Sequence, residues 1–364
     1  MLSASEIEKK VFRKEDLSLS EAMYLYNNLP LAQIAAMANE LRCQAKGNEN
    51  NVTWLIDRNV NITNICCSQC SFCNFYRKPG HSEGTITKIE EYAEKIAELR
   101  KLGGNQLLLQ GGLHPKLGLA FYSNLFKELK NIYADLRLHA LGPPEIVHIA
   151  RIEKITTKEV LEKLIEAGLD SLPGAGAEIL SDRVRKIISP VKCSSEEWLR
   201  VMREAHSLNL VTSATMMFNH VETPEERIEH LIKIRDVQSL KPKDSTGFIS
   251  FTPWPFQSAG TQLAKDFNFA NKLTAAQYIR IIAISRILLH NIKNIQASWL
   301  TVGKETAQIC LHAGANDFGS IMIEENVVSS AGASYKFDIN GIQQAITEAG
   351  FIPVRRNQYF EEIT

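Results

Sequence analysis

The sequence predicts an α/β fold, a (β/α)8 TIM-like barrel with a helical N-terminal extension. Short apolar or β-branched runs alternate with amphipathic helical segments along most of the chain. Eight such units fit the length of a closed barrel. An open doubly wound sheet is the alternative, but no Gly-x-Gly-x-x-Gly turn marks the dinucleotide site typical of that fold.

The first part of the chain is expected to be helical. SLSEAMYLYNNL and PLAQIAAMANELRCQA place apolar residues at intervals of three and four. We therefore expect a helical extension over residues 1–50 and a barrel with a C-terminal cap over residues 51–364. The expected strands are 59–65, 105–110, 136–141, 169–173, 210–218, 247–254, 294–300 and 317–323. The clearest helices between them are expected at 88–102, 160–168, 195–208, 225–238 and 275–290.

Composition narrows the class of protein. The chain has 364 residues, of which 45% are hydrophobic, enough for a well-buried core. Its 41 basic residues balance 41 acidic ones, so charge does not indicate a nucleic-acid or membrane partner. No apolar run approaches a membrane span, and the charged N-terminus has no signal-peptide core. We expect a soluble cytoplasmic protein.

Four of the seven cysteines lie within eight residues, in the stretch CCSQCSFC that starts at Cys66. This bunching and the odd count argue against a secreted disulfide framework. A structural zinc site needs two separated ligand pairs, and no second pair stands at a suitable distance. A ferredoxin-type cluster would use Cys67, Cys70 and Cys73, but the usual following x3-Cys-Pro is absent.

The third interpretation uses Cys66, Cys70 and Cys73 as C-x3-C-x2-C. Three thiolates would hold three irons of a [4Fe–4S] cluster and leave the fourth iron open for chemistry. The motif follows the first expected barrel strand, on the face where barrel enzymes carry their active sites. Spacing alone leaves both cysteine registers possible.

The motif resembles that of the radical S-adenosylmethionine (radical SAM) superfamily, in which an aromatic residue, here Phe72, precedes the last cysteine. The resemblance implies that Cys66, Cys70 and Cys73 bind a [4Fe–4S] cluster and that Cys67 is a bystander. It also implies that the open iron binds S-adenosyl-L-methionine, which is cleaved to a 5′-deoxyadenosyl radical.

Polar and small residues at other expected strand ends add candidates. The resemblance implies a cofactor-binding role for Gln110, Gly111 and Gly112, although the glycines could equally form a plain turn. Expected cofactor-binding residues are Phe72, Tyr76, Gln110, Gly111, Gly112, Gly176 and Glu178. Expected proton-transfer residues are His114, His220, Glu324 and Glu325. Each of the latter could also be a loop or surface group, and Glu178 could simply begin a helix.

A longer resemblance spans about residues 50 to 360. Within radical SAM enzymes the chain resembles the branch that serves the menaquinone and deazaflavin pathways, and within that branch most closely the dehypoxanthine futalosine cyclases. The stretches that carry it are CSFCNFYR, LLLQGGLHP, HALGPPEI, LDSLPGAGAEIL, TSATMMFNHVE, WPFQ, NIQASWLTVG and GANDFGSIMIEENVVSSAG. The chain departs from this group at Ala175 and Asn219, where glycine is usual.

The resemblance implies a reaction and its partners. The radical would abstract the C4′ hydrogen of dehypoxanthine futalosine, and the carbon radical would add to the benzoate ring. A flavodoxin or ferredoxin would donate electrons, with no nucleic acid or membrane span involved. The alternatives are an aminofutalosine synthase or a deazaflavin-precursor synthase and, from another class, an iron–sulfur electron carrier or a zinc-stabilised scaffold.

Overall fold

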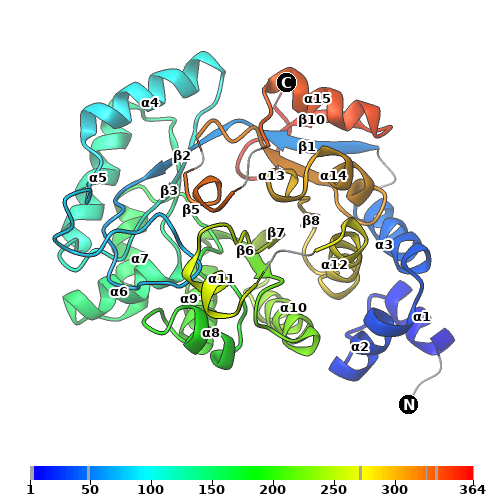
Figure 1. Cartoon of the computed structure of the whole chain (residues 1–364). Coiled ribbons are helices and arrows are strands. Elements are labelled where there is room, and N and C mark those ends of the chain that lie inside the picture. Colours follow the sequence, from blue (N-terminus) through cyan, green and yellow to red (C-terminus); the bar gives the residue numbers. More distant parts are fainter. Residues whose placement is uncertain (1–3, 47–49, 270–272, 325, 333–334, 364) are drawn as a thin grey trace.

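A computed structural model describes residues 4–46, 50–269, 273–324, 326–332 and 335–363 (Figure 1). The strands are β1 (Asn51–Leu55), β2 (Asp57–Asn61), β3 (Gln106–Gln110), β4 (Arg137–Ala140), β5 (Ser171–Leu172), β6 (Val211–Phe218), β7 (Phe248–Pro255), β8 (Asn294–Ile295), β9 (Asp317–Ser320) and β10 (Ile352–Arg355). The helices are α1 (Ala4–Phe12), α2 (Leu19–Asn28), α3 (Leu31–Lys46), α4 (Ile89–Lys101), α5 (Leu119–Ile132), α6 (Pro143–Glu153), α7 (Thr157–Glu166), α8 (Asp182–Ile188), α9 (Ser195–Ser207), α10 (Pro224–Ser239), α11 (Gln262–Asp266), α12 (Ala275–Leu288), α13 (Trp299–Val302), α14 (Lys304–Leu311) and α15 (Ile339–Glu348), with a 3-10 turn at Ser329–Ala331.

The strands form two parallel sheets that together surround a central space. One has the order β2-β3-β4-β5-β6-β7-β8, and the other has the order β10-β1-β9. A bridge between Gln296 and Asp317 joins the β8 side of the first sheet to β9. At the other side, Ile56 is the only residue between β1 and β2. The predicted α/β class with a TIM-like curled parallel sheet is confirmed.

The differences from the predicted strands have local causes. β1 and β10 were not predicted; β10 contains Pro353, which removes a ladder donor and suits the edge position that this strand takes. The predicted strand 294–300 is wrong at its end, because residues from Trp299 onward turn into the short helix α13. A short apolar run does not distinguish a strand from a buried helix.

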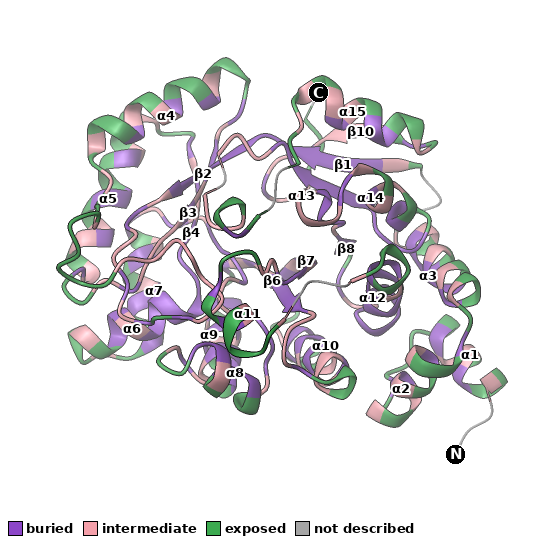
Figure 2. Cartoon of the chain, in the orientation of Figure 1, coloured by how far each residue is buried: buried purple, intermediate pink, exposed green. Residues whose placement is uncertain are grey.

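The helices cover the outside of the strands. Figure 2 shows strands that are largely buried, with helices that expose their outer faces. A capping box fixes the first turn of five of these helices. Its N-cap residue is Ser18, Thr156, Ser194, Thr223 or Thr274. Helices α2 and α3 pack on α10 and α12.

The division of the chain into an N-terminal extension and a barrel stays a prediction. Within the described residues, no helix is long and apolar enough to cross a bilayer.

His206 gives the fold a pH dependence. Its side chain is buried against Thr212, and burial lowers its pKa to about 4. Below an unfolded pKa of about 6.5, the unfolded chain binds a proton that the native state does not, so stability falls as pH falls toward 4. The free energy of unfolding should fall by about 1 kcal/mol less in His206→Gln than in wild type between pH 6 and pH 5. Urea unfolding of both proteins at the two pH values checks this. An equal loss of unfolding free energy in the two proteins would contradict it.

Candidate active site

A cavity of about 440 Å³ occupies the space inside the strands. Packed barrels fill this space with branched apolar side chains, but here alternate residues of the strands are polar. On β2 the inward residues are Asp57, Asn59 and Asn61. Further polar inward residues come from the other strands and their ends: Gln106, Gln110, His139, Ser171, Ser213, Thr215, Ser250, Thr252, Gln296, Ser298 and Ser320. The interior is therefore built to hold a ligand of about this volume.

The cysteine loop follows β2 and contributes to the lining of this cavity. Cys66, Cys70 and Cys73 line the cavity, whereas Cys67 does not. A backbone bond from Cys73 N to Cys70 O, of 3.2 Å, closes a turn between two of them. The residue before Cys70, Gln69, has a φ of 49°, which turns the chain sharply. This placement favours the register of Cys66, Cys70 and Cys73 over the register that includes Cys67.

Contacts from distant loops hold the cysteine loop. Ser71 N donates to Ile188 O at 2.9 Å, and Ser71 O accepts from Leu263 N at 2.8 Å. The Asn74 amide donates to Ala259 O and Ser330 O, at 2.9 and 3.0 Å. These bonds reach segments that follow β5, β7 and β9, so the position of the loop depends on these three parts of the barrel.

Arg77 stabilises the C-terminal end of the cysteine loop through hydrogen bonds. Its Nη1 donates to the carbonyls of residues 74, 75 and 76, at 3.1 to 3.3 Å. Its backbone N–H donates to Asn64 O, and its carbonyl accepts from Cys66 N. One side chain thus satisfies three loop carbonyls that no sheet or helix would satisfy.

The thiols are buried among hydrogen-bond donors. Cys66 Sγ accepts from Leu113 N at 3.2 Å and Ser68 N at 3.4 Å, and Ser68 Oγ lies 3.2 Å from Cys70 Sγ. Burial raises the pKa of the Cys66, Cys70 and Cys73 thiols. Iron binding would therefore release protons from them, and the N–H donors would stabilise the resulting sulfur charge.

The donor set fits a [4Fe–4S] cluster. Three cavity-facing thiols can each bind a different iron, so they need not converge on one point. Among the described residues, no three His, Cys, Asp or Glu side chains are arranged to hold a single metal ion. Three thiols without a fourth also leave one iron free for a small molecule in the cavity.

Gly112 lets the segment after β3 approach the cysteine loop. A Cβ on Gly112 would clash with Ile65 O and lie 2.8 Å from Cys66 Cβ. A Cβ on Gly111 would lie 3.1 Å from the backbone N and O of Thr63, a much milder contact than the clash of a Gly112 Cβ with Ile65 O. We therefore expect the Gly112→Ala protein to bind clearly less iron than the Gly111→Ala protein.

Iron and sulfide per chain after anaerobic reconstitution measure this effect. Gly111→Ala is the matched control because it adds the same methyl group one residue away. Equal cluster content in both proteins would show that Gly112 does not set the position of Cys66.

Lys192 brings a positive charge to the thiols, and sequence reasoning missed it. Its Nζ pairs with Glu178 Oε1 at 2.9 Å and lies 5.2 Å from the Phe72 ring centroid. Burial opposes its charge, but the nearby Cys70, Glu178 and Glu145 outweigh burial and raise the pKa of Lys192. Lys192 follows α8, away from any strand end, so no pattern in the sequence indicates that it reaches the cavity.

The residues expected to bind a cofactor come together in the cavity. Phe72, Tyr76, Gln110, Gly111, Gly112, Gly176 and Glu178 all line it. Gly176 has a φ of 71°, and a Cβ there would clash with Pro144, so this position requires glycine. The carboxyl of Glu145, also in the cavity, has its pKa raised to about 7 by burial. The roles of these residues stay predictions, and their shared location agrees with them.

The described residues expected to transfer protons lie outside the cavity lining. His114, His220 and Glu324 do not line the cavity, and Glu325 lies outside the described residues. The His114 ring accepts from Lys116 N in its own loop. Glu324 pairs with Arg58, at 2.9 Å, and with Lys95. Their geometry gives the predicted proton-transfer role no support.

His220 supports the turn after β6. Its ring contacts Met217 O and accepts from Val221 N, and Glu222 accepts from the backbone of residues 219 and 220. Asn219 has a φ of 68°, a left-handed conformation that glycine adopts freely and that asparagine tolerates. Burial is the main cause that lowers the pKa of His220.

Several polar residues deep in the cavity escaped sequence reasoning. His139 Nδ1 contacts Ser171 Oγ, and burial lowers the pKa of His139 to about 3, so the ring is neutral. Asp57 contacts Ser320 Oγ, and burial raises its pKa. Alternation along β2 and β4 could have indicated them, because polar residues occupy positions that a packed barrel fills with apolar ones.

Comparison with protein families identifies two regions of the chain. Residues 60–234 match the radical SAM superfamily, and residues 245–364 match the CofH/MqnC C-terminal region. The chain is 42% identical to a cyclic dehypoxanthine futalosine synthase of Streptomyces coelicolor, over 94% of this chain and 84% of that protein. It is 39% identical to the protein of that name from Halalkalibacterium halodurans, over 100% and 95%.

A differently named group is also similar. The chain is 39% identical to a 5-amino-6-(D-ribitylamino)uracil–L-tyrosine 4-hydroxyphenyl transferase of Methanosarcina mazei, over 94% of this chain and 90% of that protein. Among solved structures, methylornithine synthase (PylB) matches with a TM-score of 0.72 at 18% identity, over 96% and 97% of the two chains. The hydrogenase maturase HydG matches with a TM-score of 0.75 at 16% identity, over 96% and 76%. These structures share the fold.

Proposed function

The chain belongs to the radical SAM superfamily, among the cyclic dehypoxanthine futalosine synthases and their hydroxyphenyl transferase relatives, and we propose that it is a cyclic dehypoxanthine futalosine synthase of menaquinone biosynthesis. The observation that carries this proposal is the similarity of 42% and 39% over nearly the full chain to two proteins of that name. The polar barrel interior, with three thiols in its lining, supports it.

Radical SAM enzymes use a [4Fe–4S] cluster and S-adenosyl-L-methionine. Here Cys66, Cys70 and Cys73 would hold the cluster. The residues around S-adenosylmethionine would be Phe72, Tyr76, Gln110, Gly111, Gly112, Gly176 and Glu178. When bound and reduced, the cluster supplies the electron that cleaves the sulfonium. Lys192 contributes a cation beside these groups, which suits the carboxylate of the methionine part.

The chain's main task is then to position a single substrate. Cyclisation requires that the ribose C4′ lie near both the radical source and the benzoate ring of the same molecule. The cavity lining extends from the thiols, which follow the carboxyl end of β2, to Gln106, the first residue of β3, so the substrate would lie between strands. Side chains on these strands exclude water and quenching groups from the reacting carbon.

The transferase activity of the methanogen relatives is the second candidate. The Methanosarcina mazei transferase is 39% identical to this chain, the same identity as the Halalkalibacterium halodurans synthase. The WPFQ and QASW stretches resemble the cyclases, and Trp254, Gln257, Gln296, Ser298 and Trp299 from these stretches line the cavity. Cavity residues discriminate between substrates, so their resemblance weighs more than overall identity.

One anaerobic competition tests the two candidates. Reconstituted protein receives S-adenosylmethionine, a strong reductant, and equal amounts of dehypoxanthine futalosine and of 5-amino-6-(D-ribitylamino)uracil with tyrosine. We expect a product lighter than dehypoxanthine futalosine by two hydrogens, together with 5′-deoxyadenosine. A tyrosine-derived adduct as the main product would contradict the cyclase and assign the transferase.

The same proposal places the protein in its cellular setting. The reaction needs a low-potential electron donor, and a flavodoxin or ferredoxin would supply it. We also propose a cytoplasmic location, because the reaction needs reduced donor proteins and the seven free cysteines of the described chain need a reducing environment.

A further inference from the structure

Helix α8 (Asp182–Ile188) connects the cysteine loop with the ion pair between Lys192 and Glu178. The last carbonyl of the helix, Ile188 O, accepts hydrogen bonds from Ser71 N at 2.9 Å and from Ser71 Oγ at 3.2 Å, within the cysteine loop. Glu178 precedes α8 in the chain, and Lys192 follows it. One short helix therefore contacts the loop that carries the thiols and is continuous with both members of the ion pair.

The guanidinium of Arg185, in the middle of α8, joins the segments before and after the helix. Nη1 donates to Gly176 O at 3.0 Å and to Ala177 O at 2.8 Å. Nε and Nη2 donate to Cys193 O, at 2.9 and 2.7 Å. These carbonyls lie outside helices and strands, and Arg185 is only 3% exposed. Its planar fork thus supplies donors to buried carbonyls on two separate segments.

The two segments held by Arg185 lead directly to the ion pair. Ala177 is followed by Glu178, and Cys193 is preceded by Lys192. Lys192 Nζ lies 2.9 Å from Glu178 Oε1. Because Arg185 holds the carbonyl next to each partner, its side chain sets the separation of the backbone segments that carry the ammonium and the carboxylate.

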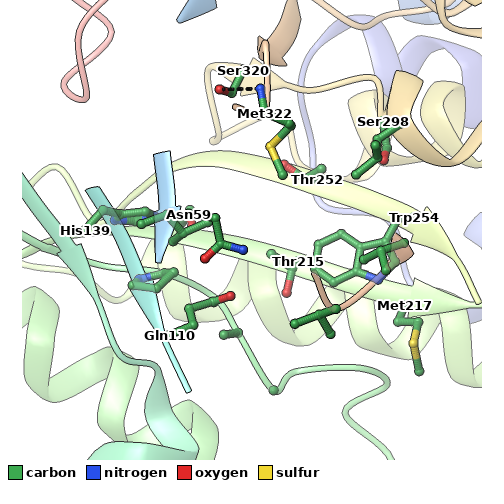
Figure 3. Close-up of a pocket in the computed structure, with 18 of the residues that line it drawn as sticks. Asn59, Gln110, His139, Thr215, Met217, Thr252, Trp254, Ser298, Ser320 and Met322 are labelled. Atoms are coloured by element: carbon green, nitrogen blue, oxygen red, sulfur yellow. Dashed lines mark hydrogen bonds between the residues drawn. The ribbon is translucent and has the colours of Figure 1, made fainter. Parts of the chain in front are cut away.

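The turn that carries Glu178 adopts a conformation that needs such support. Glu178 has a φ of 42°, which is uncommon for residues other than glycine. The hydroxyl of Thr215, a cavity residue shown in Figure 3, donates to Gly174 O at 2.6 Å, and Met217 N donates to Glu178 O at 3.0 Å. The turn is therefore held from β6 by these two bonds and from α8 by Arg185.

We propose that Arg185 is a positioning residue for S-adenosylmethionine, which fixes Lys192 against Glu178 and so places the ammonium that faces the carboxylate of the cofactor. This role rests on the placement of S-adenosylmethionine beside Lys192 in the proposed function. Arg185 itself does not line the cavity, so it acts through the residues that it holds. The role depends on the shape of the guanidinium as well as its charge, because the single nitrogen of a lysine cannot reproduce the fork.

The affinity for S-adenosylmethionine measures this role. Calorimetry on the anaerobic holoenzyme, without reductant or nucleoside substrate, gives the dissociation constant of S-adenosylmethionine. Electron paramagnetic resonance of the reduced cluster, with and without S-adenosylmethionine, gives a second readout that a change in stability alone does not move. Arg185→Lys keeps the charge and removes the fork, whereas Arg185→Gln removes both.

Arg286→Lys is the matched control. Arg286 lies on α12, is only 2% exposed, and donates to Gly314 O and Lys293 O at 2.8 and 3.0 Å. These two residues precede β9 and β8, whereas the residues held by Arg185 follow β5 and α8. The control therefore removes a buried fork of the same kind at the opposite end of the strands.

We expect Arg185→Lys to bind S-adenosylmethionine roughly tenfold or more weakly than wild type, because the cation that faces the cofactor is displaced. Its iron content should be unchanged, because the backbone carbonyl of Ile188 still holds the cysteine loop. The change that S-adenosylmethionine causes in the resonance signal should be reduced at the same ligand concentration. Arg286→Lys should lose thermal stability but bind S-adenosylmethionine within about twofold of wild type.

A double-mutant cycle shows whether Arg185 acts through Lys192. In the Lys192→Met background the ammonium is absent, so Arg185→Lys should weaken binding by less than about twofold more. Additive losses of affinity would show that Arg185 acts on another part of the site and would overturn the proposal.

The remaining outcomes also decide the question. Wild-type affinity in Arg185→Lys, or an equal loss of affinity in Arg286→Lys, would show that Arg185 serves the fold alone. Loss of the cluster in both Arg185→Lys and Arg185→Gln would place its role at the cysteine loop and overturn the proposal. If only Arg185→Lys loses the cluster, an unpaired buried ammonium is the cause, and the affinity of Arg185→Gln decides in the same way. A wild-type holoenzyme that binds no S-adenosylmethionine would contradict the proposed function itself.

Discussion

Alanine in place of Cys66, Cys70 or Cys73 is expected to abolish both the iron–sulfur cluster and turnover, whereas Cys67→Ala retains both. The three cavity-lining thiols would each bind a different iron, so losing any one removes a ligand that the chain does not replace. Cys67 lies outside the cavity lining, although its thiol is next to Cys66 in sequence.

Iron and sulfide content and the electron paramagnetic resonance signal of the reduced protein measure this outcome. Cys67→Ala is the matched control because it makes the same change within the same loop. Retention of the cluster in Cys66→Ala with loss in Cys67→Ala would establish the ferredoxin-like register of Cys67, Cys70 and Cys73. In that register one cluster ligand, Cys67, would lie outside the cavity lining.

Lys192→Met is expected to lower reductive cleavage of S-adenosylmethionine by about 10²–10³-fold, because it removes the positive charge beside the thiols. The change leaves Glu178 buried without its ion-pair partner, and removing one member of a buried pair costs about 3–5 kcal/mol. Lys192→Arg keeps the charge and should retain a large part of the activity.

The double variant Lys192→Met/Glu178→Gln separates folding from chemistry. Its two changes remove the whole ion pair, so the stability lost in Lys192→Met should largely return in thermal unfolding. Cleavage of S-adenosylmethionine should stay low, because the cation is still missing. Recovery of cleavage together with stability would show that Lys192 serves only the fold.

Strands that are marked by a local apolar run could be predicted from the sequence. Strands that form only through pairing with a segment far away in the sequence could not. Residues 106–110 and 211–218 have apolar runs whose bounds match the predicted strands to within one residue. β10 contains a proline, and only its pairing with β1, some 300 residues earlier, makes it a strand. Nothing in the local sequence reports such a pairing.

The site divides in the same way. The cysteine motif and the residues at strand ends are continuous in sequence, so a known pattern could find Cys66, Gln110 and Gly176. Lys192 reaches the cavity from a loop after α8, which no sequence pattern indicates, whereas alternation along β2 and β4 could have indicated Asn59 and His139. Conversely, His220 lies beside a strand end, but the turn after β6 directs its ring toward its own backbone. Position in the sequence therefore indicates which loops follow the strands, but not which way their side chains point.

Transfer of a label from the substrate tests the central claim most directly. Dehypoxanthine futalosine carrying deuterium at C4′ is incubated with the wild-type holoenzyme, S-adenosylmethionine and reductant, and the 5′-deoxyadenosine formed is analysed by mass spectrometry. We predict one deuterium in 5′-deoxyadenosine and a cyclic product that has lost it. Unlabelled 5′-deoxyadenosine alongside a substrate that keeps its deuterium would contradict the proposal that this cavity positions C4′ for radical cyclisation.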